Sequence, residues 1–150
     1  MSLQEKITAQ IKTAMRAKDT VALTSLRAIK SAILLSQTQR GAAKALTTAD
    51  EIALLQRLVK QRKESAAIYQ AQGREDLAMP ELEQVEVISQ FLPTQLSAPA
   101  LREALSGVID RLGASGMKDM GRVMGQASKE LAGKADGKSI SRIVKELLGN

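Results

Sequence analysis

The sequence feature that most constrains the fold is the near absence of aromatic residues. The chain of 150 residues contains one Tyr, one Phe and no Trp. A core must therefore be built from Leu, Ile, Val, Ala and Met, which suit helix-on-helix packing better than a β-sandwich. Val and Ile also never alternate with polar residues over the length of a strand, so the period-two pattern of strands is missing. The sequence predicts an all-α fold.

The chain also lacks the two residue types that most often carry chemistry. It has no His and no Cys, which excludes disulfides, thiolate nucleophiles, zinc–thiolate sites and imidazole bases. Ser128 and Lys129 are adjacent, as are Lys138 and Ser139, so each pair would point in different directions on a helix. The sequence contains no Walker loop and no carboxylate cluster with metal-ligand spacing. We expect no autonomous catalytic site, no metal site and no small-molecule cofactor.

The overall charge points to an anionic partner. Lys and Arg total 22 against 16 Asp and Glu, a net charge of +6. Such a balance makes an anionic partner plausible without singling out nucleic acid. The polar N-terminal segment lacks the apolar run of a signal peptide, and no apolar stretch approaches the length of a membrane span. The sequence predicts a cytoplasmic protein that does not contact membranes.

Hydrophobic periodicity predicts seven helices in two domains, a four-helix bundle over 1–96 and a three-helix domain over 97–150. The bundle helices are expected near 2–18, 19–40, 48–72 and 80–92. The expected caps are Ser2 with Glu5, Asp19, and Thr48 with Glu51, while Pro80 fits the first turn of the fourth helix. The last three helices are expected over 98–112, 117–131 and 137–148, capped by Ser97, Ser115 and Asp136.

Apolar residues at helical spacing also predict the buried faces. In the bundle these are Leu3, Ile7, Ile11, Ala14 and Met15; Ala22, Leu26, Ile29 and Ile33; Ile52, Leu55, Val59, Ala66 and Tyr69; and Leu82, Val85, Ile88 and Leu92. In the second domain they are Leu101, Leu105, Val108, Ile109 and Leu112; Met117, Met120, Met124, Ala127 and Leu131; and Ile140, Ile143, Val144, Leu147 and Leu148. The methionines of the sixth helix are thus expected in the core.

Positive charge is concentrated near the C-terminus. Between Gly116 and Lys145 there are seven cations and three acids, which raises the expectation of an anion-binding surface. No aromatic residue occurs there, so an RNA ligand would be recognised through its backbone and shape rather than by stacking of its bases. The candidate RNA-binding residues are Lys118, Arg122, Lys129, Lys134, Lys138, Arg142 and Lys145.

Four glycines accompany these cations. Gly121 and Gly125 lie one turn apart inside a predicted helix, where each costs about 1 kcal/mol relative to Ala. Two explanations stay open, close packing of a neighbouring helix or close approach of a sugar-phosphate backbone. Gly133 and Gly137 belong to a loop that opens onto a helix N-terminus. Backbone N–H groups and the helix dipole make such a loop a candidate phosphate site.

Several short motifs, taken in order and spacing, resemble those of the GatB/YqeY family over essentially the full length of the chain. One departure is Met79-Pro80, which would break a fourth helix expected to be continuous and charged. The motifs are LRAIK at 26–30, QRKES at 61–65, GREDL at 73–77, FLP at 91–93, QLS at 95–97, MKDMG at 117–121, VM at 123–124, GKADGK at 133–138 and VKELL at 144–148.

The resemblance implies a helical bundle followed by a small three-helix domain. This arrangement is similar to the C-terminal region of the B subunit of glutamine-dependent aspartyl/glutamyl-tRNA amidotransferase, whose tail contacts tRNA away from the reacting end. Carried over by motif, the resemblance assigns tRNA contact and close approach to the backbone to residues of the second domain. They are Lys118, Arg122, Lys134 and Lys138 for contact, and Gly121 and Gly125 for close approach.

Three functional hypotheses follow. The leading one is an accessory protein that binds tRNA or another structured RNA. The second is participation in glutamine-dependent amido transfer onto aminoacyl-tRNA, a carbon–nitrogen ligase activity that would need an amidotransferase or aminoacyl-tRNA synthetase as partner. The third is a protein-interaction module that uses Arg57, Lys60 and Lys63 on the third helix, a face whose charges otherwise read as an ordinary solvated surface.

Overall fold

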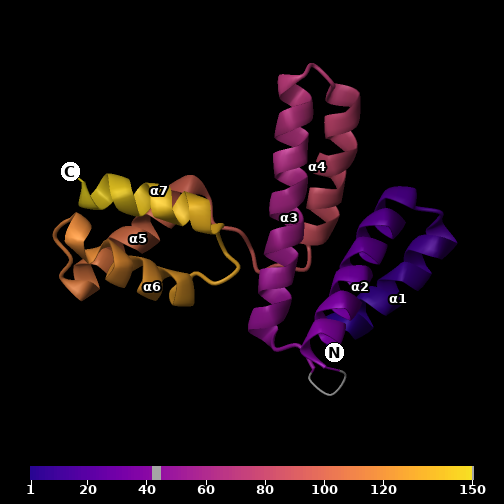
Figure 1. Cartoon of the computed structure of the whole chain (residues 1–150), viewed down its shortest axis with the longest axis horizontal. Helices are drawn as coiled ribbons and strands as arrows, with labels where there is room; N and C mark the ends of the chain where they lie inside the picture. Colours follow the sequence, from indigo (N-terminus) through magenta and orange to yellow (C-terminus); the bar gives the residue numbers. More distant parts are fainter. Residues whose placement is uncertain (42–44, 150) are drawn as a thin grey trace. The chain divides into compact units, whose positions relative to one another are not determined.

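The all-α fold predicted from the sequence is confirmed. The structure, a computed structural model, describes residues 1–41 and 45–149, and these ranges contain helices and no strand (Figure 1). The chain forms two compact units, Met1–Leu92 and Pro93–Asn150. The helices are α1 (Leu3–Ala17), α2 (Thr20–Arg40), α3 (Thr48–Ala71) and α4 (Glu75–Ser89) in the first unit, and α5 (Ala98–Leu112), α6 (Met120–Glu130) and α7 (Gly137–Leu148) in the second.

The N-terminal unit consists of two helical hairpins, α1 with α2 and α3 with α4 (Figure 1). Its core draws on all four helices, but it uses the first half of α3 and the last turns of α4. Met15, expected in this core, is 55% exposed, so that prediction was wrong. The buried residues of the core are Leu3, Ile7, Ala14, Leu26, Ile29, Ile33, Leu54, Leu55, Leu58 and Ile88.

The starts of the first three helices follow the caps seen in the sequence, with one shift. Ser2 and Glu5 form the expected capping box, and the Asp19 carboxylate accepts from the Ala22 N–H. The third helix is capped one residue earlier than predicted, by Thr47 with Asp50 instead of Thr48 with Glu51. Both pairs have the spacing of a capping box, so the sequence could not separate them.

The face that α3 buries also differs from the prediction. Ile52, Val59 and Tyr69 were expected inside but are only half-buried. Leu54 and Leu58 are buried instead, beside Leu55 and Ala66, which were predicted.

The fourth helix starts earlier than predicted and is not broken. It begins at Glu75, so Pro80 lies inside it and not in its first turn. The turn before it is closed by Gly73, at φ 71°, whose N–H donates to Gln70 O, and by the Arg74 N–H, which donates to Tyr69 O. These two hydrogen bonds form a Schellman motif, which lets α4 begin before the proline. The interior of α4 therefore contains a proline, Pro80, which cannot donate a backbone hydrogen bond.

The C-terminal unit is a three-helix core. α5 and α7 have the predicted bounds, and Ser97 and Asp136 cap them as expected. Helices α5, α6 and α7 contact one another pairwise. Their buried residues are Leu101, Leu105, Val108, Val123, Ala127, Leu131, Ala135, Ile140, Ile143, Val144 and Leu148.

The start of the sixth helix differs from the prediction. A 3₁₀ turn over Met117–Asp119 comes before α6, and the Ser115 side chain does not cap the helix. Instead, the Ser115 N–H donates to the Asp119 carboxylate at 3.0 Å. Met117, which lies in this turn, is 49% exposed, and Val123 of α6 is fully buried. Placing Met117 in the core was therefore wrong, whereas Met120 and Met124 pack partly buried against the core.

The described ranges were also searched for a membrane-spanning segment. None of their helices combines the length and the apolar character that crossing a bilayer requires.

Candidate nucleic-acid interface

All seven candidate cations lie on the surface of the C-terminal unit. α6 carries two of them, α7 carries three, and the 3₁₀ turn and the loop between α6 and α7 carry one each. Both helices bury their apolar faces in the shared core, which leaves the cations on the outward faces. In order along the chain they are Lys118, Arg122, Lys129, Lys134, Lys138, Arg142 and Lys145.

Arginine and lysine are used differently in this unit. Each of its four arginines forms an ion pair with a carboxylate of the same unit, whereas none of its five lysines forms one with any described residue. The lysines are therefore the cations that remain for an outside partner. The pairs are Arg102–Glu146 at 2.9 Å, Arg111–Glu130 at 2.7 Å, Arg122–Asp119 at 3.3 Å and Arg142–Glu146 at 3.7 Å.

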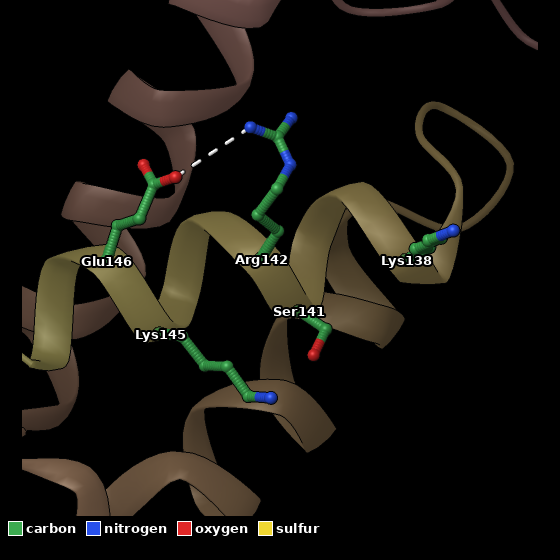
Figure 2. Close-up of a pocket in the computed structure, with 5 residues that line it drawn as sticks. All are labelled: Lys138, Ser141, Arg142, Lys145 and Glu146. Carbon is green, nitrogen blue, oxygen red and sulfur yellow. Dashed lines mark ion pairs between the residues drawn. The ribbon is translucent and has the colours of Figure 1, made fainter.

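An open hollow of about 420 Å³ lies along α7 and is lined by Lys138, Ser141, Arg142, Lys145 and Glu146 (Figure 2). In Figure 2, Arg142 leans toward Glu146, while Ser141 and Lys145 point away from that pair. All five residues belong to one helix, so the hollow does not enclose a small molecule in the manner of a ligand pocket. Three of its five lining residues are cations and one, Glu146, is an acid.

The structure bears on the first of the two explanations for Gly121 and Gly125, close packing of a neighbouring helix. Both glycines are exposed, and a Cβ added to either would meet no atom of the described chain within 4 Å. Neither residue has a positive φ. Within this structure, neither packing of a neighbouring helix nor backbone conformation requires glycine at these positions.

The loop before α7 is less open to a phosphate than the sequence suggests. Asp136 caps α7, and its carboxylate accepts from the Ser139 N–H at 3.0 Å and the Ser139 hydroxyl at 2.7 Å. A carboxylate thus already occupies part of the helix N-terminus where a phosphate was expected. Gly133 is buried at φ 78°, while Gly137 is exposed in the first turn of α7. What the loop offers an anion is the exposed side chains of Lys134 and Lys138.

The turn that carries Lys118 is held by Asp119. The hydrogen bond from the Ser115 N–H lowers the pKa of the Asp119 carboxyl below its ordinary value, and the charges of Arg122 and Lys118 lower it further. The carboxylate is therefore ionised at neutral pH and bridges both sides of the turn. Lys118 therefore lies on a turn whose backbone is held by the hydrogen bond between the Ser115 N–H and the Asp119 carboxylate.

The Gln95 side chain makes hydrogen bonds to this region that the sequence did not predict. Gln95 Nε2 donates to Gly133 O at 2.6 Å and to Pro93 O at 2.8 Å. The Leu96 N–H donates to Lys134 O at 2.9 Å. Gln95 lies in the QLS motif, but no sequence pattern shows which carbonyl an amide side chain will reach.

The parts of the chain that the structure describes contain no group of three or more acidic side chains placed to hold a metal ion.

Comparisons with known proteins identify the family. The model of the family described as Yqey-like protein matches residues 4–148. Among curated proteins, the chain is 28% identical over 149 residues to "Altered inheritance of mitochondria protein 41, mitochondrial" of Pyrenophora tritici-repentis (strain Pt-1C-BFP), covering 96% of this chain and 80% of that protein. Because the family match spans nearly the whole sequence, the chain belongs to the family of Yqey-like proteins.

Proposed function

We propose that this protein binds structured RNA, with tRNA as the first candidate, through the outward faces of α6 and α7. The observation that carries the proposal is the pair of exposed helical glycines, Gly121 and Gly125, which nothing in the described chain requires. Gly125 lies in the interior of α6, where glycine costs about 1 kcal/mol relative to Ala, whereas Gly121 lies in the first turn, where the cost is smaller. A partner that approaches the helix backbone closely accounts for that cost.

The side chains around the glycines indicate the chemistry of the partner. Arg122 follows Gly121 directly, and Lys129 lies one turn after Gly125, on a neighbouring part of the same exposed surface. Lys129 forms no ion pair within the described ranges, as is true of Lys118 at the start of this surface. Small residues flanked by available cations suit a sugar-phosphate chain, which is anionic and needs room beside the backbone.

The composition of the unit favours structured RNA over single strands. Residues 93–149 contain no Phe, Tyr or Trp. Proteins that bind single strands generally stack bases on aromatic side chains, which this unit cannot do. This unit can instead recognise an RNA through its phosphates and its folded shape.

A salt series with bulk tRNA tests the proposal. We expect a Kd tighter than ~100 μM at low salt, rising steeply with salt because phosphate contacts release counterions. Substituting Lys118, Lys129 or Lys138 by Ala should reduce the slope of log Kd against log salt by about one each. Lys60→Ala, an exposed lysine on α3 in the other unit, is the matched control and should leave the slope unchanged. Binding weaker than ~100 μM at low salt would refute the proposal.

A further inference from the structure

The segment that leads into α5 is fastened to the loop that carries Lys134. The Gln95 side chain donates to Gly133 O at 2.6 Å, and the Leu96 N–H donates to Lys134 O at 2.9 Å. Gln95 Nε2 also donates to Pro93 O at 2.8 Å, which folds the segment back on itself. Leu96 packs against the core of the C-terminal unit. The Gln95 side chain and the Leu96 backbone N–H thus bind two successive carbonyls of the loop, those of Gly133 and Lys134.

These contacts complete the support of the Lys134 backbone. The Lys134 N–H donates to Leu131 O at 2.9 Å, so its peptide groups are held on both sides. Leu131, Gly133 and Ala135 are buried, whereas the Lys134 side chain is exposed between them. Loss of the Gln95 donor would leave the carbonyl of buried Gly133 without that hydrogen bond, an unfavourable state that the loop would relieve by moving.

We propose that Gln95 is a positioning residue for RNA contact by Lys134. The inference rests on the proposed RNA-binding function and concerns one lysine of that surface. A cation on a preordered backbone loses less conformational freedom on binding than one on a mobile loop. Gln95 carries no charge and does not itself contact RNA; it acts by holding the loop so that Lys134 meets a phosphate.

The test uses the salt slope, which a general loss of stability does not change. Gln95→Met keeps the length of the side chain and removes both N–H donors. We expect it to weaken tRNA binding about as much as Lys134→Ala does, about fivefold to tenfold at ~0.1 M salt, and to lower the salt slope by about one. Gln126→Met is the matched control, because the Gln126 amide donates to the Glu130 carboxylate within α6 and no hydrogen bond within the described ranges joins it to the loop. It should leave the slope unchanged.

A double-mutant cycle then identifies the residue through which Gln95 acts. Gln95→Met combined with Lys134→Ala should bind no more weakly than either variant alone, while its combination with Lys118→Ala should lose the product of the two single effects. An unchanged slope in Gln95→Met, or multiplicative losses with Lys134→Ala, would overturn the positioning role. Gln95→Asn keeps the amide one methylene shorter; it should give the same result and serves if the Met variant folds poorly. If the wild-type protein does not bind tRNA, the proposed function fails and this inference with it.

Discussion

At the scale of single residues, three helices within the described ranges are followed by a residue in a left-handed backbone conformation. In one of the three, that residue is a lysine and not a glycine. Lys18 adopts φ 55° after α1, while Gly73 after α3 and Gly113 after α5 have φ 71° and 62°. The turns after α1 and α5 have equivalent pairs of closing hydrogen bonds. A left-handed conformation is unfavourable for a residue with a Cβ, so Lys18 is strained where glycine would not be.

Replacing Lys18 by Gly should therefore stabilise the fold. Relief of the left-handed conformation, less the greater freedom of glycine in the unfolded chain, predicts a gain of about 0.5–1 kcal/mol in the free energy of unfolding. Chemical denaturation measures it. The reverse substitution at the equivalent place, Gly113→Lys, should lose a similar amount. An unchanged or lower stability of Lys18→Gly would mean that the lysine side chain contributes more than the backbone strain removes.

For the exposed glycines of α6, we predict that substitution by Ala raises the stability of the fold and weakens RNA binding. Gly125→Ala should raise the free energy of unfolding by about 1 kcal/mol, because the site lies inside α6 and has room for a methyl group. Gly121→Ala, in the first turn of α6, should raise it by less. The same variants should weaken tRNA binding if RNA approaches the helix there. Gly107→Ala in α5, where an added Cβ also meets nothing within 4 Å, is the control that should gain stability with unchanged binding. Unchanged binding in all three variants would count against the α6 face.

At the scale of elements, prediction succeeded where caps and periodicity agreed. α5 and α7 each begin directly after a capping residue, Ser97 and Asp136, and their predicted bounds are confirmed. The start of α6 could not be predicted from Ser115, because a carboxylate three residues inside the expected helix binds the Ser115 N–H and imposes a 3₁₀ turn. Met117 lies in that turn and is half exposed, which the helical periodicity did not predict.

The candidate site was also predictable only in part. The sequence identified its cations, because surface Lys and Arg on an amphipathic helix lie opposite the apolar face. It could not show which of them are already paired, because the Arg102–Glu146 and Arg111–Glu130 pairs join helices whose packing the sequence does not reveal. The partners of Gln95 depend in the same way on a contact between residues 38 positions apart.

Pro80 gives a prediction about the stability of α4. In the interior of a helix, proline lacks one hydrogen bond and crowds the preceding turn. Pro80→Ala should raise the free energy of unfolding by about 1–3 kcal/mol. Pro99→Ala, in the first turn of α5 where proline is tolerated, should change it little. Thermal unfolding of the two variants compares the positions directly, and equal shifts would contradict the account.

The turn at Asp119 predicts a local response to acid. Because folding lowers the pKa of Asp119, its contribution to stability is fully present above the ordinary carboxyl pKa and is lost as the pH falls through the lowered value. We expect the Ser115 amide, followed by NMR, to titrate with that lowered pKa. In Asp119→Asn this titration should disappear. If the Ser115 signal titrates unchanged in the variant, another group is responsible.

At the scale of the whole molecule, the two hydrophobic cores share no residue. The buried residues of one cluster lie between Leu3 and Ile88, and those of the other between Leu101 and Leu148. Leu92 packs against the first core and Leu96 against the second, so the two cores come within a few residues of each other along the chain. Gln95 and Leu96, bound to the Lys134 loop, make the end of this connection part of the C-terminal unit.

Separate cores predict that residues 93–150 fold without the first unit. A fragment of this size is near the lower limit for independent folding, so we expect a helical and cooperative but less stable domain. Circular dichroism and denaturation of the fragment measure this. If the α6 and α7 faces supply the phosphate contacts, the fragment should bind tRNA with the salt slope of the full chain, because that slope counts contacts. A folded fragment with a clearly smaller slope would show that the N-terminal unit also contacts the RNA, and Lys60 and Lys63 on the exposed surface of α3 would then be the first residues to test.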